Sequence, residues 1–199
     1  LMREIAGDAR LIGCWVVLPA MTGEVPPERD QVAHLLDSGG RAARLCPAAH
    51  RLSLEPWEVE GLLGALEARR VPLLLDCDVR HWSEARPWRF VEWAGRAYPR
   101  LPLVLVREPQ ANLRTLLPLL ERCPHLALEA SYFQVHDGIA LVAERWGAHR
   151  LVFGTGLPEW DPGLAVTGLT YAGLDRQTLL SVAHGTLERL LAGAGSSSG

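Results

Sequence analysis

Short apolar runs recur along the chain at nearly regular intervals. Most of them are continuously apolar rather than alternating, which is typical of strands that are covered on both faces of a parallel sheet. They occupy residues 11–18, 42–46, 72–76, 102–106, 126–130 and 150–155, so that their first residues lie 24 to 31 residues apart. Each interval is long enough for a crossover helix and its loops. The pattern predicts six βα units.

Helical spacing is clearest between the second and third runs. Residues 55–70, "EPWEVEGLLGALEARR", begin with a proline and acids, and end with two arginines. Val59, Leu62 and Leu66 lie on one stripe at helical spacing. Acids at the start and arginines at the end both suit the helix dipole, and proline is well accepted in the first turn. We therefore predict a helix here.

The same helical pattern recurs in the later intervals. The segments are 86–99, 110–124 and 136–150. Pro118 is expected to kink or shorten the second of these helices, because proline cannot donate a backbone hydrogen bond. A last helix is expected over about residues 174–192 of this single domain. The Gly/Ser-rich tail over 193–199 has nothing to bury, and we expect it to be disordered.

Two architectures are compatible with six βα units. An open doubly wound sheet of the dinucleotide-binding type would have a G-x-G-x-x-G motif after an early strand, and the sequence contains none. A complete (β/α)8 barrel takes ~250 residues and eight strands, so this chain is about two units short of one. Periodicity alone does not separate the two. The strand order does, because a doubly wound sheet has its strands in non-sequential order.

Composition argues against several classes of partner. The chain is 48% hydrophobic and 22% charged, which is ordinary for a globular domain. With a net charge of -3 and dispersed basic residues, it has no basic patch of the kind that binds nucleic acid or an anionic membrane. No apolar run approaches the ~20 residues that span a bilayer, and the first residues do not resemble a signal peptide. We expect a cytoplasmic protein.

The residue types that are missing also matter. All 20 basic residues are arginine. This excludes a Schiff-base lysine, a phosphate-loop lysine and a carbamylated lysine that bridges two metals. The four cysteines, Cys14, Cys46, Cys77 and Cys123, form no C-x-x-C pair. They are expected to be buried free thiols, and not a zinc site or a disulfide framework.

A series of short motifs accompanies the strand ends, where function lies in both architectures. The motifs are "GGRAARLCP", "VPLLLDCD", "LPLVLVREP", "LALEASYF" and "RLVFGTGLP", followed near the C-terminus by "LLSVAHGTLERLL". In order, spacing and flanks this series resembles the second amidohydrolase family, the metal-dependent TIM-barrel hydrolases and decarboxylases. The resemblance covers nearly the whole chain. It implies an α/β fold of the (β/α)8 TIM-barrel type, with about six βα units present.

The resemblance also shows which family residues are replaced. The family has H-x-H on its first strand, and this sequence contains no H-x-H. Asp76 and Arg107 stand where the resemblance expects metal-binding histidines, and Gly156 stands where it expects the aspartate that binds metal and acts as general base. Glycine cannot accept a proton, and arginine repels a metal ion. We expect no cofactor, and the first residues resemble the helix that leads into the family's third strand.

Side chains near the third strand end are candidates for chemistry. Asp76, Asp78 and His81 lie within six residues and could form a metal site or an acid/base pair. The alternative is that these acids cap a helix or pair with arginine. Glu159 and Asp161 follow a proline in a loop, where a solvated turn is the simpler interpretation.

Two arginines near neighbouring strand ends suggest an anion site. Arg44 and Arg107, if both point into the mouth of the barrel, would form a fork for a carboxylate or phosphate. The alternative is that they neutralise Glu129 and the aspartates of the third strand end in a buried ion network. Trp82 and Trp160 follow strand ends and are candidates for an aromatic wall of the pocket.

Two functional hypotheses remain open. In the first, the barrel has lost its metal centre and binds a small anionic ligand or serves as a non-catalytic subunit. In the second, it is an active metal-dependent hydrolase or decarboxylase, holding zinc or another divalent metal in an altered site or with ligands from a segment upstream. An incomplete barrel leaves sheet edges and an apolar face uncovered, so we also expect a homo-oligomer.

Overall fold

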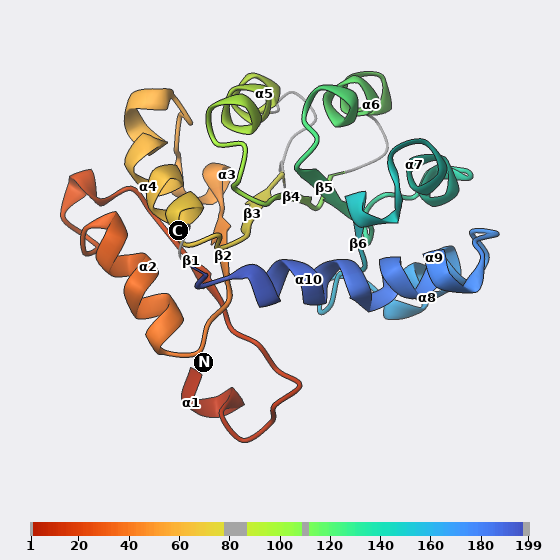
Figure 1. Ribbon diagram of the computed structural model, residues 1–199, viewed down its shortest axis with the longest axis horizontal. Helices are drawn as coiled ribbons and strands as arrows, with labels where there is room; N and C mark the ends of the chain where they lie inside the picture. The colour runs from red at the N-terminus through yellow and green to blue at the C-terminus, as the bar shows by residue number, and fades with distance from the viewer. Residues whose placement is uncertain (1, 78–86, 109–111, 197–199) are drawn as a thin grey trace.

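In the computed structural model, six parallel strands form one open sheet (Figure 1). The structure describes residues 2–77, 87–108 and 112–196. The strands are β1 (Cys14–Val16), β2 (Ala42–Leu45), β3 (Leu73–Asp76), β4 (Leu103–Val106), β5 (Leu126–Glu129) and β6 (Leu151–Val152). Their spatial order is their sequence order. This order confirms the barrel-type topology and excludes a doubly wound sheet.

Each strand lies inside the apolar run that predicted it, although every strand is shorter than its run. Successive side chains of a strand point to opposite faces of the sheet. The register pairs Arg44 with Leu74, and Asp76 with Val106, so these four side chains share one face. That face would be the inside of a closed barrel.

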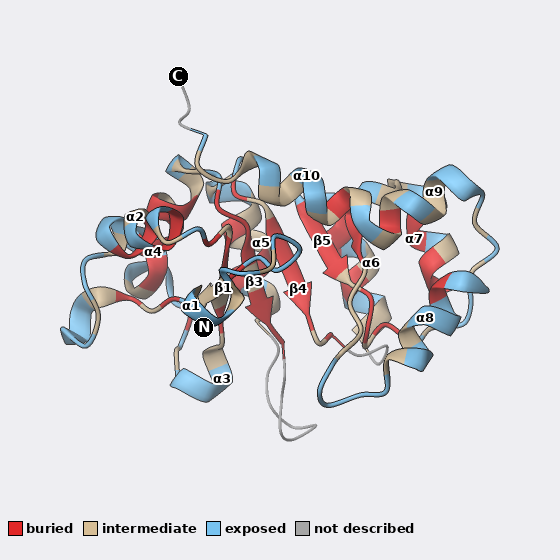
Figure 2. Ribbon diagram, turned by 90° about the horizontal axis from the view of Figure 1, so that it is seen from below, coloured by how far each residue is buried: buried red, intermediate tan, exposed pale blue. Residues whose placement is uncertain are grey.

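Helices cover the other face of the sheet (Figure 1). They are α2 (Glu28–Asp37), α4 (Pro56–Ala68), α5 (Trp88–Ala97), α6 (Leu113–Arg122) and α7 (Gly138–Trp146). The four helices predicted between residues 55 and 150 are thereby confirmed. Most of the residues that Figure 2 colours as buried belong to the strands and to the helices that cover them. Fully buried leucines such as Leu62, Leu73 and Leu105 belong to this main core, and each contributes about 1.5–3 kcal/mol through burial.

Pro118 was expected to kink or shorten its helix; the helix does not end at the proline, and the kink stays a prediction. Helix α6 continues to Arg122, beyond the proline inside it. Proline removes the hydrogen bond to the carbonyl four residues earlier, which belongs to Arg114. Both Pro118 and Arg114 are exposed, so water can reach this carbonyl and the helix persists.

The C-terminal helix lies on the inner face of the sheet. It consists of α9 (Arg176–Leu180), a π-helical segment (Ser181–Gly185) and α10 (Thr186–Gly193), and thus confirms the last predicted helix. Leu187 and Leu190 of α10 pack on a second apolar cluster formed by Val104, Val106, Ala127 and Val152. Figure 1 shows α10 across the sheet from α5 and α6. Helix α10 therefore covers part of what would be the barrel interior.

The remaining elements are short or were not predicted. They are α1 (Met2–Ile5), η1 (Ala20–Thr22), α3 (Pro47–His50), η3 (Ala148–Arg150) and α8 (Pro162–Thr170). After α10, the N–H of Gly195 donates to the carbonyl of Arg69 over 2.8 Å, which ties this end of the chain to α4. Within the described ranges, no helix has the length and apolar character needed to cross a membrane.

Candidate functional site

An ion network lies at the carboxyl ends of β2, β3 and β4. Its centre is Asp76, the last residue of β3, whose side chain is only 3% exposed. Arg44 Nη2 lies 2.5 Å from Asp76 Oδ2, and Arg44 Nε donates to the same oxygen over 3.1 Å. The Arg44 side chain is 38% exposed, so it is in contact with water as well as with the buried carboxylate.

Arg107 binds the same carboxylate through two nitrogens of its guanidinium group. Nε donates to Asp76 Oδ1 over 2.9 Å, and Nη2 donates to Oδ2 over 2.8 Å. This fork is the strongest arrangement of an arginine on a carboxylate. The backbone of Arg107 has φ 60°, in the left-handed region, which costs a non-glycine residue roughly 1–2 kcal/mol. The two bonds to Asp76 help to offset this cost.

The network continues into the loop that follows β6. Arg107 Nη1 lies 3.2 Å from both carboxylate oxygens of Glu159. The hydroxyl of Tyr132 donates to Glu159 Oε2 over 2.8 Å. The hydrogen bond from Tyr132, followed by the charge of Arg107, lowers the pKa of Glu159. Trp160 packs edge-on against Tyr132 with the ring centroids 5.3 Å apart, which places two aromatic rings beside the network.

Glu159 was not expected to take part in this site. A solvated turn was the simpler interpretation, and Asp161 does act locally, as the N-cap of α8 that accepts from the N–H of Gly163. A signal for Glu159 was nevertheless present, because it follows the end of a parallel strand, as Arg107 does. Such ends meet at one edge of the sheet.

Gly156 occupies the position where the resemblance expects a catalytic aspartate. Its φ is 73°, and a Cβ atom built there would lie 3.2 Å from Cβ of Trp160. An L-residue at this position would therefore be strained and would press on Trp160. The backbone at this point suits glycine and does not present a side chain to the site.

Glu129 makes its hydrogen bonds away from the arginines. It accepts from the N–H of Ser131 over 2.8 Å and from the Ser131 hydroxyl over 2.7 Å. Its carboxylate lies over Gly154, where an added Cβ atom would be only 1.9 Å from Oε1. Glu129 thus pairs with Ser131 and not with the arginines, contrary to the expectation that it joins their network. Gly154 provides the space for the Glu129 side chain.

The cysteines are free, as predicted. Cys77 and Cys123 are buried as expected, whereas Cys14 and Cys46 are partly exposed, so the expectation of full burial is wrong for these two. Burial raises the pKa of Cys14 to about 11. Burial, followed by the charge of Asp76, raises the pKa of Cys46, whose Sγ lies 3.8 Å from Asp76 Oδ2. Both thiols are therefore protonated near neutral pH and are poor nucleophiles.

The described donors do not fit a divalent metal. In the part of the chain that the structure describes, no group of three His, Cys, Asp or Glu side chains could hold one. The Asp76 carboxylate that a metal would need is instead bound by two guanidinium groups, whose charge repels a cation. Asp78, His81 and Trp82 lie outside the described residues, so their suggested roles stay predictions.

Comparison with known proteins identifies the fold. No family model and no curated protein matches the sequence. Among solved structures, an uncharacterized TIM-barrel protein from Bordetella bronchiseptica superposes with a TM-score of 0.76 at 18% identity, covering 98% of this chain and 73% of that one. The 5-carboxyvanillate decarboxylase from Sphingomonas paucimobilis gives a TM-score of 0.74 at 14% identity, covering 96% and 70%.

A third match is a dihydroxybenzoic acid decarboxylase from a Polaromonas species with bound manganese and an inhibitor. Its TM-score is 0.66 at 13% identity, covering 96% of this chain and 72% of that one. An amidohydrolase II is also among the matches. The TIM-barrel fold implied by the sequence resemblance is therefore confirmed. With six parallel strands in an open sheet, the chain has the fold of a partial barrel.

Proposed function

We propose that this chain is an amidohydrolase-like barrel protein in which an arginine–carboxylate network has replaced the metal centre, and that it acts as a non-catalytic ligand-binding protein or subunit. The observation that carries the proposal is the convergence of Arg44 and Arg107 on the buried carboxylate of Asp76. This occurs at the carboxyl ends of the strands, where barrel proteins place their function. Two permanent cations there would oppose a divalent ion.

A small carboxylate is the ligand that this site fits best. Glu159 holds the outer nitrogen of Arg107, but its side chain is 56% exposed. An exposed ion pair contributes only about 0–1 kcal/mol, so the carboxylate of a ligand can displace that of Glu159 from Arg107 at low cost. Tyr132 and Trp160 would then lie beside the body of the ligand. Aromatic carboxylates, of the kind named for the matched decarboxylases, combine both features.

Calorimetric titration with 2,6-dihydroxybenzoate tests this proposal. We expect saturable binding, abolished by Arg107→Ala. Glu159→Gln should tighten binding several-fold, because it removes the internal competitor for Arg107. Glu24→Gln, on an exposed loop remote in sequence from the site, is the matched control. If Glu159→Gln and Glu24→Gln bind 2,6-dihydroxybenzoate equally, the ligand does not compete for Arg107.

The alternative function is an active metal-dependent decarboxylase or hydrolase. It is favoured by the manganese bound in one matched decarboxylase. It requires Asp76, Asp78 and His81 to act in an altered site, or ligands from a segment upstream of Leu1. Incubation with zinc or manganese and 2,6-dihydroxybenzoate separates the two functions. Metal-dependent release of carbon dioxide supports the alternative, and unchanged substrate supports the non-catalytic role.

A further inference from the structure

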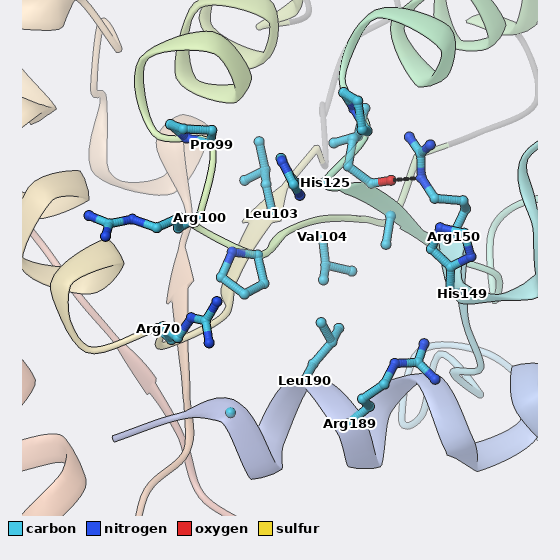
Figure 3. A pocket seen from close by; sticks show the side chains of 15 residues that line it. Arg70, Pro99, Arg100, Leu103, Val104, His125, His149, Arg150, Arg189 and Leu190 are labelled. Atoms are coloured by element: carbon cyan, nitrogen blue, oxygen red, sulfur yellow. Dashed lines mark hydrogen bonds between the residues drawn. The ribbon is translucent and has the colours of Figure 1, made fainter. Parts of the chain in front are cut away.

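A cavity of about 570 Å³ lies at the opposite end of the sheet from the ion network. Its walls include Leu103 and Leu126, the first residues of β4 and β5, and Leu190 of α10 (Figure 3). The ion network is at the carboxyl ends of the strands, whereas this cavity is at their amino ends. The two are therefore separate sites.

The cavity is strongly basic. Of the described residues that line it, none is an aspartate or glutamate. Arg100 is one of its cations, but its guanidinium points away from the space in Figure 3, toward Glu67 at 3.8 Å. The remaining basic side chains are Arg70, His125, His149, Arg150 and Arg189. They come from four separate parts of the chain, because His149 and Arg150 are adjacent, and the fold brings these parts to one place.

Arg150 gives the cavity a fixed and buried positive charge. The residue is 4% exposed. Its Nε donates to the carbonyl of Leu126 over 2.5 Å, and Nη2 donates to the carbonyls of Leu120 and Cys123 over 2.9 and 2.6 Å. These neutral acceptors hold the guanidinium in place but do not cancel its charge. Burial lowers the pKa of Arg150 by more than the nearby Cys123 and Glu121 raise it.

His149 lies beside Arg150 in the sequence and lines the same cavity. Its pKa is lowered by burial and then by the charges of Arg150 and Arg189. The ring lies against Gly147, where an added Cβ atom would be 2.6 Å from Nδ1. A neutral imidazole near pH 7 can donate one hydrogen bond to an anion, or become charged when an anion binds.

We propose that this cavity binds a small organic anion, in which a phosphate or carboxylate group is attached to an apolar body. Arg70 and Arg189, which are exposed at the rim on either side of Leu190, supply guanidinium donors to the anionic group (Figure 3). Val104, Ala127 and Leu190 provide an apolar wall. The volume is within the roughly 300–1,000 Å³ that small-molecule sites occupy.

Binding at this site would also stabilise the position of α10. Arg189 and Leu190 belong to α10, whereas His149 and Arg150 lie immediately before β6. An anion held between them bridges the C-terminal helix and the sheet. A ligand that binds only the folded state stabilises it by RT ln(1 + L/Kd), where L is the free ligand concentration, so the unfolding temperature rises with ligand concentration.

Calorimetric titration with phenyl phosphate at low ionic strength tests the proposal. We expect saturable binding that inorganic phosphate reproduces more weakly, because it lacks the apolar body. Arg189→Ala and Arg70→Ala should each weaken phenyl phosphate binding about tenfold, the size of a lost charge-assisted hydrogen bond. Arg114→Ala, an exposed arginine of α6 outside the cavity, is the matched control. Equal affinity in Arg189→Ala, Arg70→Ala and Arg114→Ala would overturn the proposal, as would the absence of saturable binding.

Two further readouts identify the site. In an NMR titration, the His149 imidazole should have a pKa below 6.5 in the free protein, and phenyl phosphate should raise it by stabilising the charged ring. An unchanged His149 pKa at saturating phenyl phosphate would contradict binding in this cavity. Glu159→Gln should leave phenyl phosphate affinity unchanged, since Glu159 belongs to the network at the other end of the sheet. A change of affinity in this variant would place the ligand at that network instead.

Discussion

Replacing Asp76 with asparagine removes a negative charge that both Arg44 and Arg107 bind, with little change in shape. The carboxylate is 3% exposed and accepts four hydrogen bonds from the two guanidinium groups. Removing one partner of a buried ion pair costs roughly 3–5 kcal/mol. Because the arginine side chains are 38% and 21% exposed, water compensates part of this cost. We therefore expect a loss of about 2–3 kcal/mol, a large fraction of a typical stability of ~5–15 kcal/mol.

Urea denaturation followed by circular dichroism measures this loss as a lower midpoint at unchanged slope. Glu159→Gln is the matched control, because it removes a carboxylate from the exposed end of the same network. We expect it to cost less than about 1 kcal/mol. If Asp76→Asn is no more destabilising than Glu159→Gln, then Asp76 is not the centre of the network and the replacement of the metal by arginine loses its physical basis.

Three other predictions concern protonation and assembly. Burial raises the pKa of Cys14 to about 11, so only about one Cys14 thiol in a thousand is ionised at pH 8. Iodoacetamide should therefore label Cys14 slowly. Labelling at the rate of the amino acid cysteine in solution would contradict the burial of this thiol. The folded-state pKa of Glu159 is lowered, so its stabilising contribution is present above the unfolded pKa of about 4.5 and is lost as the pH falls through the folded value. Glu159→Gln should remove this acid-dependent part of the stability. If the stability of the wild-type chain and that of Glu159→Gln change identically with pH, Glu159 makes no such contribution. Val16, exposed on the edge strand β1, favours pairing of two sheets edge to edge. Light scattering should detect a dimer that Val16→Asp dissociates, and a monomeric wild-type chain would refute this.

The strands and most helices were predictable because their signals are local. Continuous apolar runs specify strands that are buried on both faces, and each strand lies within such a run. Helix α8 was missed because its residues are apolar on all sides and form no stripe. Its start did carry a signal, since Asp161 caps the helix and Pro162 occupies the first turn. The π-helical turn at Ser181–Gly185 has no comparable sequence signal.

The site was predictable where it depends on strand ends. Arg44, Asp76 and Arg107 follow from the alignment of neighbouring parallel strands, and pairing of the arginines with acids was one of the two interpretations. The bond from Arg107 to Glu159 crosses 52 residues and depends on the path of a loop. The hydrogen bond that the Ser131 hydroxyl donates to Glu129 is local, and it competes with the longer-range pairing of Glu129 that the sequence suggested.

The basic cavity had no sequence signal at all. Its cationic residues come from the start of strands, from loops and from α10, and nothing in their spacing links them. They meet because α10 packs on the inner face of the sheet through Leu187 and Leu190. The site therefore depends on tertiary packing of the last helix, which local patterns do not specify.

The most direct test of the central claim is the metal content of the purified chain. Elemental analysis after dialysis against metal-free buffer, followed by addition of zinc or manganese and a second dialysis, measures what the strand ends retain. A carboxylate already held by two guanidinium groups should keep far less than one ion per chain. Retention of about one tightly bound zinc or manganese ion per chain would contradict the account.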